Sequence, residues 1–291
     1  MEAGSSWFIT CCTSVAACLI LSVAYVASLY IWRTKESRDH PAVIIRRFYS
    51  VFVAMCLSPP LVYLCMDDSI LQKTSMFQLL GLRLDGLWQA FLYPLGLTMI
   101  LFLGSLSMQG LTGLWSLYAE PMYWIWNLTD SRFLRSHVVA PIAEEFVFRA
   151  CMMPLLLQCF RPLTAVFIAP LFFGVAHLHH MIDRMRHGQL SFKHALVVSC
   201  FQMTYTTIFG AYSAFLFVRT GHLAAPFIAH AFCNHMGFPD FAEVLTYESP
   251  QRFIIMSLFF IGLLTWCLLL APMTDPALYY NNMFWKPLLM S

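Results

Sequence analysis

The sequence predicts an all-α protein that crosses a membrane several times. Of its 291 residues, 59% are hydrophobic and only 11% are charged, and the mean hydropathy is +0.68. Several apolar runs are close to the length at which a helix spans the hydrocarbon core of a bilayer. The formal net charge of +2 argues against a nucleic-acid-binding protein. We therefore expect a polytopic transmembrane helical bundle.

The apolar runs divide the chain into about eight spans, each near the length needed to cross a bilayer. They cover residues 7–32, 47–66, 86–109, 137–160, 162–180, 194–218, 222–238 and 252–271. The first run is too long for the apolar core of a cleaved signal peptide, so we interpret it as a membrane span. We find no internal repeat, and we expect residues 1–291 to form a single transmembrane domain with its polar motifs within 137–238.

Basic residues set the expected orientation of these spans. The loop from Arg33 to Arg47 holds five Lys or Arg residues, and loops of this kind stay in the cytosol. With this loop in the cytosol the N-terminus is lumenal, and the cytosolic segments hold eleven basic residues whereas the lumenal segments hold five. On this orientation the glycosylation sequon at Asn127 faces the cytosol and should stay unmodified.

Three ionisable residues, Glu144, Glu145 and Arg149, interrupt the apolar run from Val138 to Phe160. One acid at mid-membrane costs about 2.5–3.5 kcal/mol, so such a cluster indicates a functional site. Glu145 and Arg149 are spaced i and i+4, and we expect an ion pair on one helix face. Glu144 lies about 100° round the helix without such a neighbour, which favours it for catalysis. The alternative for all three is a structural role between helices.

On the expected orientation, further polar residues lie at the depth of Glu144. His177 is near the cytosolic end of the fifth span, and His230 and Asn234 share a helix face in the seventh. A desolvated carboxylate is a better base than one in water, so Glu144 could take a proton from water, with His177 sharing that task and protonating a leaving amine. His230 and Asn234 could donate hydrogen bonds to an oxyanion. This set fits amide hydrolysis without a covalent intermediate, whereas the alternative for the histidines is interhelical hydrogen bonding.

Other chemistries use some of the same residues. Zinc could bind Glu144, His177 and His230, but no HExxH motif occurs, so we expect no metal or other cofactor and keep a zinc-dependent hydrolysis as the alternative. A thiol mechanism through Cys151 would need a base beside it. The ten cysteines lie mostly in apolar runs and form no CxxC pair, which favours free buried thiols. A transporter would distribute its acids along a path instead of clustering them on one side.

The segment 110–135 is rich in Trp and Tyr and too long for a tight turn. Amphipathic rings of this kind sit at the headgroup level of a bilayer. We therefore expect an anchor at the membrane interface, and a gate for a lipid-bearing substrate is the alternative.

The polar residues form three motifs that resemble the signature of a known family. The motifs are Glu144-Glu145-x-x-x-Arg149, Phe173-x-x-x-His177 and His230-x-x-x-Asn234. They are similar to those of the CAAX-protease and bacteriocin-processing (ABI) family. Flanking stretches such as RDHPAVI at 38–44 and PLFFGVAHLHH at 170–180 resemble the eukaryotic type II CAAX prenyl endopeptidases, the Ras-converting enzymes.

This resemblance implies an intramembrane protease of the endoplasmic reticulum that removes the C-terminal aaX tripeptide from isoprenylated CAAX proteins, Ras-type GTPases among them. The implied roles are water activation by Glu144 and His177, oxyanion stabilisation by His230 and Asn234, and support of the site by Glu145 and Arg149. Membrane lipid is an expected partner, because an isoprenyl chain partitions into it at about 0.8 kcal/mol per buried CH₂. The active site is expected to open towards the cytosol.

Overall fold

The structure is a computed structural model that describes residues 2–32, 34, 36–176, 185 and 191–284. Within these residues every regular element is a helix, which confirms the predicted all-α class. The chain begins with α1 (Glu2–Ser28), α2 (Pro41–Cys65), α3 (Asp68–Leu71), α4 (Met76–Leu79), α5 (Leu87–Leu101), α6 (Leu103–Leu111), α7 (Leu114–Tyr118), α8 (Pro121–Thr129) and α9 (Ser131–Leu134). It continues with η1 (Arg135–Val139), α10 (Ala140–Glu145), η2 (Phe146–Cys151), α11 (Met152–Leu157), α12 (Pro162–Ala176), α14 (Phe192–Thr220), α15 (Ala224–Met236), α16 (Phe241–Val244), α17 (Gln251–Met273) and η3 (Pro276–Tyr279).

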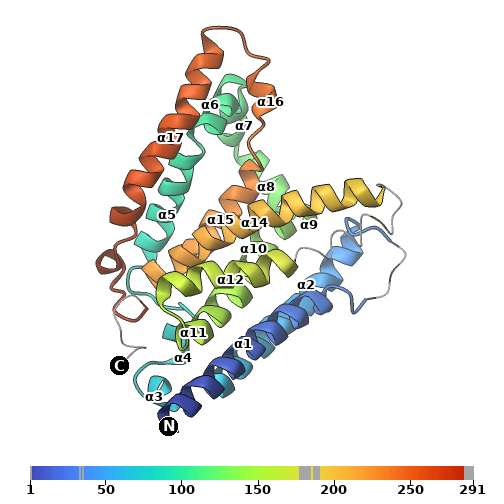
Figure 1. The fold of residues 1–291 in the computed structure, drawn as a ribbon. Coiled ribbons are helices and arrows are strands. Elements are labelled where there is room, and N and C mark those ends of the chain that lie inside the picture. Colours follow the sequence, from blue (N-terminus) through green and yellow to red (C-terminus); the bar gives the residue numbers. More distant parts are fainter. Residues whose placement is uncertain (1, 33, 35, 177–184, 186–190, 285–291) are drawn as a thin grey trace.

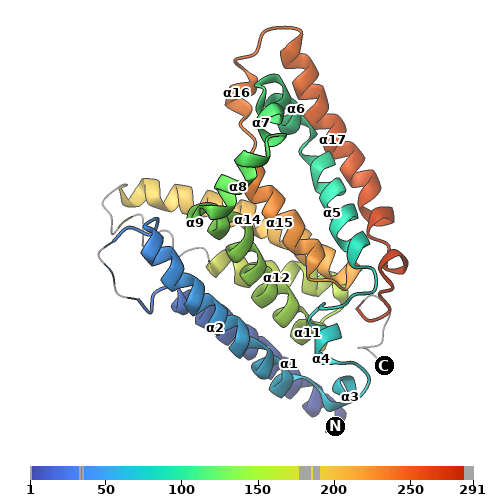
Figure 2. The ribbon, with the colours of Figure 1, turned by 180° about the vertical axis from the view of Figure 1, so that it is seen from behind.

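The helices surround one central run, which passes without a break from α9 through η1, α10 and η2 to α11. Figures 1 and 2 show the α1 and α2 pair along one side of the molecule and the α5 and α17 pair along another. α12, α14 and α15 lie between these pairs, and α12 packs against α14, which in turn packs against α15. The central run contacts helices from both ends of the chain: α1 packs against α11, and α15 packs against η1 and α10.

The sequence explains why this run is central. Every residue of η2 and of α11 is buried, and a helix that is apolar on all sides is stable only where other helices cover it. Phe148 and Leu155 are among the largest fully buried side chains of the described part of the chain. Two charged residues of this run, Glu145 and Arg149, are therefore almost completely shielded from water.

The outer helices turn apolar side chains outwards. Three described helices are long and apolar enough to cross a membrane, Trp7–Ser28, Pro41–Cys65 and Gln251–Met273, and α5 with α6 makes a fourth if the two count as one span. Only 11% of the most apolar stretch of α17 is buried, and outward-facing apolar surface of this extent is what lipid covers. These helices fit a multi-pass membrane protein. The structure has a helix in each predicted span, while the number of spans stays a prediction.

The predicted span 86–109 is not straight. α5 and α6 meet at Phe102 with a bend of 74°. A Cβ atom on Gly104 would come within 2.4 Å of the Phe259 ring, and one on Gly262 within 2.5 Å of the Ile100 carbonyl oxygen. The two glycines thus let α17 pack closely against both halves of the bent pair.

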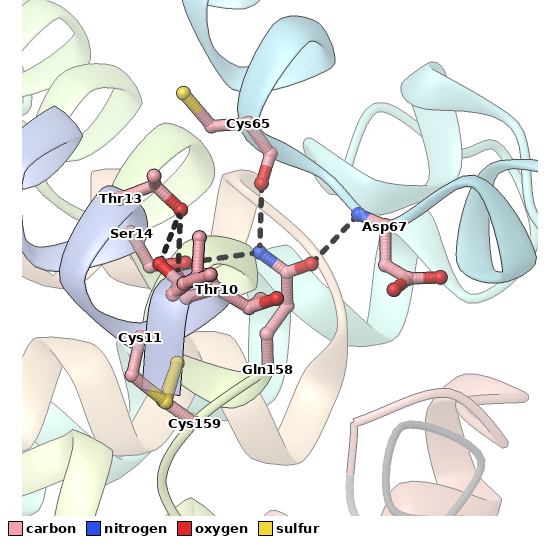
Figure 3. Close-up of a disulfide and its surroundings, with 9 residues drawn as sticks. Thr10, Cys11, Thr13, Ser14, Cys65, Asp67, Gln158 and Cys159 are labelled. Atoms are coloured by element: carbon pink, nitrogen blue, oxygen red, sulfur yellow. Dashed lines mark hydrogen bonds between the residues drawn. A yellow bond between two sulfur atoms is a disulfide. The ribbon is translucent and has the colours of Figure 1, made fainter. Parts of the chain in front are cut away.

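A disulfide joins Cys11 on α1 to Cys159, just after α11 (Figure 3). The two Cα atoms are 5.3 Å apart although 148 residues separate the cysteines along the chain. Beside it, the Gln158 amide donates to Ser14 Oγ and accepts from the Asp67 backbone N–H. The prediction of free thiols is wrong for this pair, because spacing along the sequence does not report contacts between distant helices. The cysteines named from the apolar runs, Cys18, Cys56, Cys151, Cys200 and Cys267, are free.

Candidate active site

Glu145 and Arg149 form the predicted ion pair. Arg149 Nε lies 3.2 Å from Glu145 Oε2, and the exposed fractions of the two side chains are 1% and 0%. The guanidinium also lies over the Phe173 ring, 4.3 Å from its centroid, and Ser213 on α14 donates a hydrogen bond to Glu145 Oε2. Because a buried ion pair needs further hydrogen bonds to offset desolvation, these contacts from α12 and α14 explain how the pair is tolerated.

His230 on α15 completes this buried group. Its Nδ1 atom lies 2.7 Å from Glu145 Oε1, and because an ionised carboxylate only accepts hydrogen bonds, Nδ1 is the donor. The hydrogen bond from Nδ1 to Glu145 therefore fixes the orientation of the imidazole ring, and Arg149 and Ser213 hold Glu145 in place. The structure thus gives Glu145 two partners, His230 and Ser213, beyond the Arg149 that the sequence predicted.

Glu144 lies on the other side of His230. Its Oε2 atom is 3.8 Å from His230 Nε2, and 18% of its side chain is exposed. The Tyr25 hydroxyl on α1 donates to Glu144 Oε1 at 3.5 Å, which is a long and weak contact. Of the two adjacent acids, Glu145 is buried in the protein and Glu144 reaches accessible space, as the helical geometry predicts.

Glu144 opens into a cavity of about 470 Å³. Tyr25, Phe48, Val51, Ala140 and Phe148 provide part of its apolar wall, and Arg38, Arg47, Arg135 and Asn234 provide polar groups. The volume is within the range of small-molecule and cofactor sites. This cavity brings a carboxylate, an amide and several guanidiniums to one accessible space.

Asn234 lies one turn after His230 on α15. Its Nδ2 atom donates to the Ser136 carbonyl oxygen on η1 at 2.8 Å, and the residue lines the same cavity as Glu144. Since an amide nitrogen carries two protons, this bond fixes the amide and leaves one N–H for another acceptor. Asn234 and Glu144 thus line one cavity, and His230, one turn earlier on α15, contacts both acids.

His177 lies outside the described residues. The structure thus brings together Glu144, Glu145, Arg149, His230 and Asn234 of the predicted set and leaves the placement of His177 a prediction. The roles assigned to these residues likewise remain predictions at this point.

Two π-helical turns frame the acidic pair. η1 ends directly before α10, and η2 begins at Phe146, directly after Glu145. A π turn changes the direction of the side chains on its two sides relative to a regular α-helix, and such turns are frequent at functional sites. The apolar run predicted one regular helix, so these turns and their effect on side-chain direction could not be anticipated.

Sequence reasoning also missed several residues of the site. Tyr25 and Ser213 contact the two acids from α1 and α14, and three arginines line the cavity. Ser213 belongs to the stretch Gly210-Ala211-Tyr212-Ser213, which combines small and polar residues within an apolar span. That composition was an available signal, whereas nothing in the sequence distinguished Tyr25 from other tyrosines.

A second cavity, of about 610 Å³, lies on the other side of η1 and α15. Phe133 and His137 line it from α9 and η1, and Trp115, Tyr118 and Trp124 line it from the aromatic segment 110–135. The predicted interfacial segment thus packs beside the site. The wall of this second cavity is almost entirely apolar.

Within the described residues, no group of three or more His, Cys, Asp or Glu side chains could hold a metal ion. The zinc-dependent alternative therefore has no support from the residues whose positions are known. The expectation that the reaction needs no cofactor stays a prediction.

Comparison with known proteins identifies similar chains. A family model described as type II CAAX prenyl endopeptidase Rce1-like matches residues 126–236. "CAAX prenyl protease 2" of Homo sapiens is 48% identical over 277 residues, which is 92% of this chain and 83% of the human protein. "CAAX prenyl protease 2" of Arabidopsis thaliana is 36% identical over 294 residues, covering 92% of each chain. No solved structure matches.

Proposed function

Because this chain belongs to the Rce1-like family of type II CAAX prenyl endopeptidases, we propose that Glu144 is the base of its hydrolytic reaction. The chain is a protease that removes the C-terminal tripeptide from prenylated CAAX proteins. The finer assignments, which concern residue roles, cofactor, substrates and location, are our proposals.

In the proposed reaction Glu144, together with His177, takes a proton from a water molecule. The water oxygen attacks the carbonyl carbon of the prenylated cysteine, and the carbonyl oxygen becomes an oxyanion. The carbon–nitrogen bond then breaks, and the proton held by the site passes to the leaving amine of the tripeptide. The products are a prenylcysteine carboxylate and a free tripeptide, and no covalent enzyme intermediate forms.

His230 and Asn234 are proposed to stabilise the oxyanion. His230 Nδ1 donates a hydrogen bond to Glu145, so the other ring nitrogen, Nε2, faces Glu144 and the reacting groups. Donation to an oxyanion from this atom requires a proton on Nε2, in addition to the proton through which Nδ1 bonds to Glu145. Asn234 adds its free N–H at the cavity wall. Preorganised donors of this kind are often the largest contribution to acyl-transfer catalysis.

The single observation that carries this proposal is that the two adjacent acids differ in burial and in their bonding partners. Glu145 is fully buried, and its carboxylate oxygens form an ion pair with Arg149 and accept hydrogen bonds from Ser213 and His230. Among the described residues, the His230 ring is the only basic side chain within 4.0 Å of the Glu144 carboxylate, and Glu144 lines a cavity of about 470 Å³. A buried, fully bonded carboxylate cannot accept a proton from water as readily as a partly exposed one.

We propose Ras-type GTPases and other isoprenylated CAAX proteins as substrates, and the endoplasmic reticulum membrane as the location. We also propose that the cavity opens to the cytosol and that the N-terminus is lumenal. The disulfide supports this orientation, because it lies near the N-terminal end of α1 and disulfides persist in the oxidising lumen but rarely in the cytosol.

The test uses purified, reconstituted protein and a fluorogenic farnesylated CAAX peptide. Glu144→Gln keeps the shape of the side chain but removes the base, so turnover should fall by roughly 10²–10⁴-fold. The exposed acid Glu248 gives the matched control Glu248→Gln, which should retain wild-type turnover. Near-normal turnover of the folded Glu144→Gln variant would refute the assignment.

Metal independence is tested on the same preparation. Incubation with phenanthroline should leave turnover unchanged, and elemental analysis should find less than one equivalent of zinc per chain. Loss of activity with phenanthroline and its recovery with added zinc would overturn this part of the proposal.

A further inference from the structure

The wall of the Glu144 cavity carries more positive charge than the proposed chemistry uses. Arg38, Arg47 and Arg135 all line it, and they come from the loop after α1, from α2 and from η1. A hydrolytic site needs a base and oxyanion donors, and neither of these tasks requires three guanidiniums at the cavity wall. Their presence therefore calls for an anionic ligand group.

Only one acid is paired with these arginines in the described part of the chain. Arg135 Nη1 lies 2.8 Å from Asp39 Oδ1, and Arg38 Nε lies 3.9 Å from the same oxygen. The hydrogen bond from Arg135 holds the pKa of Asp39 below its usual range, so this carboxylate is ionised at neutral pH. In formal charges, Asp39 and Glu144 offset two of the three guanidiniums, so the wall keeps one positive charge.

Arg47 is the guanidinium that is available to a ligand. Among the described residues it forms no ion pair, and its guanidinium carbon lies over the face of the Tyr30 ring, 5.8 Å from the centroid. Arg135, in contrast, is anchored by Asp39 and by the Arg38 carbonyl oxygen. The planar fork of an arginine matches a carboxylate with two parallel hydrogen bonds.

The position of the arginines fits the length of the leaving group. Arg135 precedes Glu144 by nine residues, which is at most about 13.5 Å along the run at the α-helical rise of 1.5 Å per residue, because η1 is a π turn with a smaller rise. Three residues in an extended chain span about 10–11 Å. A peptide with its scissile bond at Glu144 would therefore bring the carboxylate at the end of a tripeptide within reach of the arginine side chains.

We infer that Arg47, with Arg38 and Arg135, binds the C-terminal carboxylate of the substrate and so measures the three residues that are released. This inference rests on the proposed function, because it places the scissile bond at Glu144. Arg47 is then a specificity-determining residue, because it contributes to the affinity for substrates whose C-terminal carboxylate lies three residues after the prenylated cysteine. The apolar wall between the two ends, formed by residues such as Phe48 and Val51, would then contact the side chains of the tripeptide.

The first experiment compares two farnesylated peptides that differ only in their C-terminus, one a free carboxylate and the other a primary amide. Hydrogen bonds to charged groups are worth enough to change affinity roughly 10- to 100-fold. The wild-type protein should therefore cleave the acid with a kcat/KM that is 10- to 100-fold higher than for the amide. Equal values for the two peptides would overturn the inference.

The second experiment repeats this comparison with Arg47→Gln. In this variant kcat/KM should fall for the peptide with the free carboxylate, mainly through a higher KM. The ratio of kcat/KM for that peptide to kcat/KM for the amide peptide should approach one. Arg46 is the matched control, since it is the adjacent arginine on α2, is exposed and does not line the cavity. Arg46→Gln should keep the wild-type preference. A uniform loss on both peptides in Arg47→Gln would contradict a carboxylate-binding role.

A length series keeps the inference testable without any variant. A peptide with four residues after the farnesylcysteine carries its carboxylate about 3.3–3.6 Å further on, so cleavage at the same bond should fall at least tenfold. In the amide series this dependence on length should be much weaker, and equal dependence in both series would count against the inference. Failure of the proposed function looks different, because then Glu144→Gln would cleave the acid and the amide like the wild type.

Discussion

Glu145 Oε1 and His230 Nδ1 lie 2.7 Å apart, in a part of the protein where the exposed fraction is 0% for the Glu145 side chain and 7% for that of His230. The bond links the central helical run to α15 and fixes the direction in which the imidazole faces Glu144. It also means that Glu145 has two tasks, since it neutralises Arg149 and orients His230. Removal of this carboxylate should therefore affect stability and turnover together.

We expect Glu145→Gln to destabilise the protein markedly. Removing one member of a buried ion pair leaves the other charge uncompensated, at a cost of about 3–5 kcal/mol, and Arg149 is 1% exposed. The measurement is the thermal unfolding midpoint in detergent, with ligand-free protein at fixed concentration. A midpoint equal to that of the wild type would show that Arg149 finds another partner.

The double variant Glu145→Met with Arg149→Met separates stability from orientation. Replacement of a buried ion pair by apolar residues of similar volume is often neutral or stabilising, so the unfolding midpoint should recover towards that of the wild type. Turnover should stay low, because His230 has lost the acceptor that fixes its ring. Recovery of both properties would show that Glu145 is only a structural partner of Arg149.

Asn234→Ala should lower turnover by roughly 10²–10³-fold with a smaller change in KM, as expected for loss of an oxyanion donor. Asn234→Asp keeps the size of the side chain but offers no N–H when ionised, so it should be at least as slow. Steady-state kinetics on the farnesylated peptide checks both variants. A change confined to KM would assign Asn234 to substrate binding instead.

Local geometry explains what the sequence could predict about this site. The spacing of Glu145 and Arg149 predicted their ion pair, because a helix brings i and i+4 to one face whatever surrounds it. The same reasoning correctly put Glu144 on a different face. Both statements depend only on the helix that carries the residues.

Contacts between distant segments were beyond the reach of the same reasoning. The bond from His230 to Glu145 depends on the rotation of α15 against α10, and the contact of Ser213 depends on α14. The pairing of Cys11 with Cys159 depends on how α1 packs on α11. The π turns also escaped prediction, because they are set by the packing around the helix and not by its apolar pattern.

The disulfide should contribute measurably to stability. Cys11 and Cys159 close a loop of 148 residues in sequence, and the loss of a native disulfide costs typically about 2–5 kcal/mol. We expect Cys11→Ser to lower the unfolding midpoint while kcat on the farnesylated peptide stays near that of the wild type, since the bond lies away from Glu144. Cys12 is free and exposed next to it, so Cys12→Ser is the matched control and should change neither quantity.

The proposed orientation makes two opposite predictions about glycosylation. Asn127 is the acceptor of a sequon on α8, and it should stay unmodified in a eukaryotic host because this segment is proposed to face the cytosol, where the glycosylation machinery is absent. A flexible N-terminal extension that carries a sequon should be glycosylated, because the N-terminus is proposed to be lumenal. Glycosidase treatment followed by electrophoresis reads out both sites. The reverse pattern would place the Glu144 cavity on the lumenal side, where it could not meet cytosolic prenylated proteins, and would overturn the proposed orientation without touching the assignment of the base.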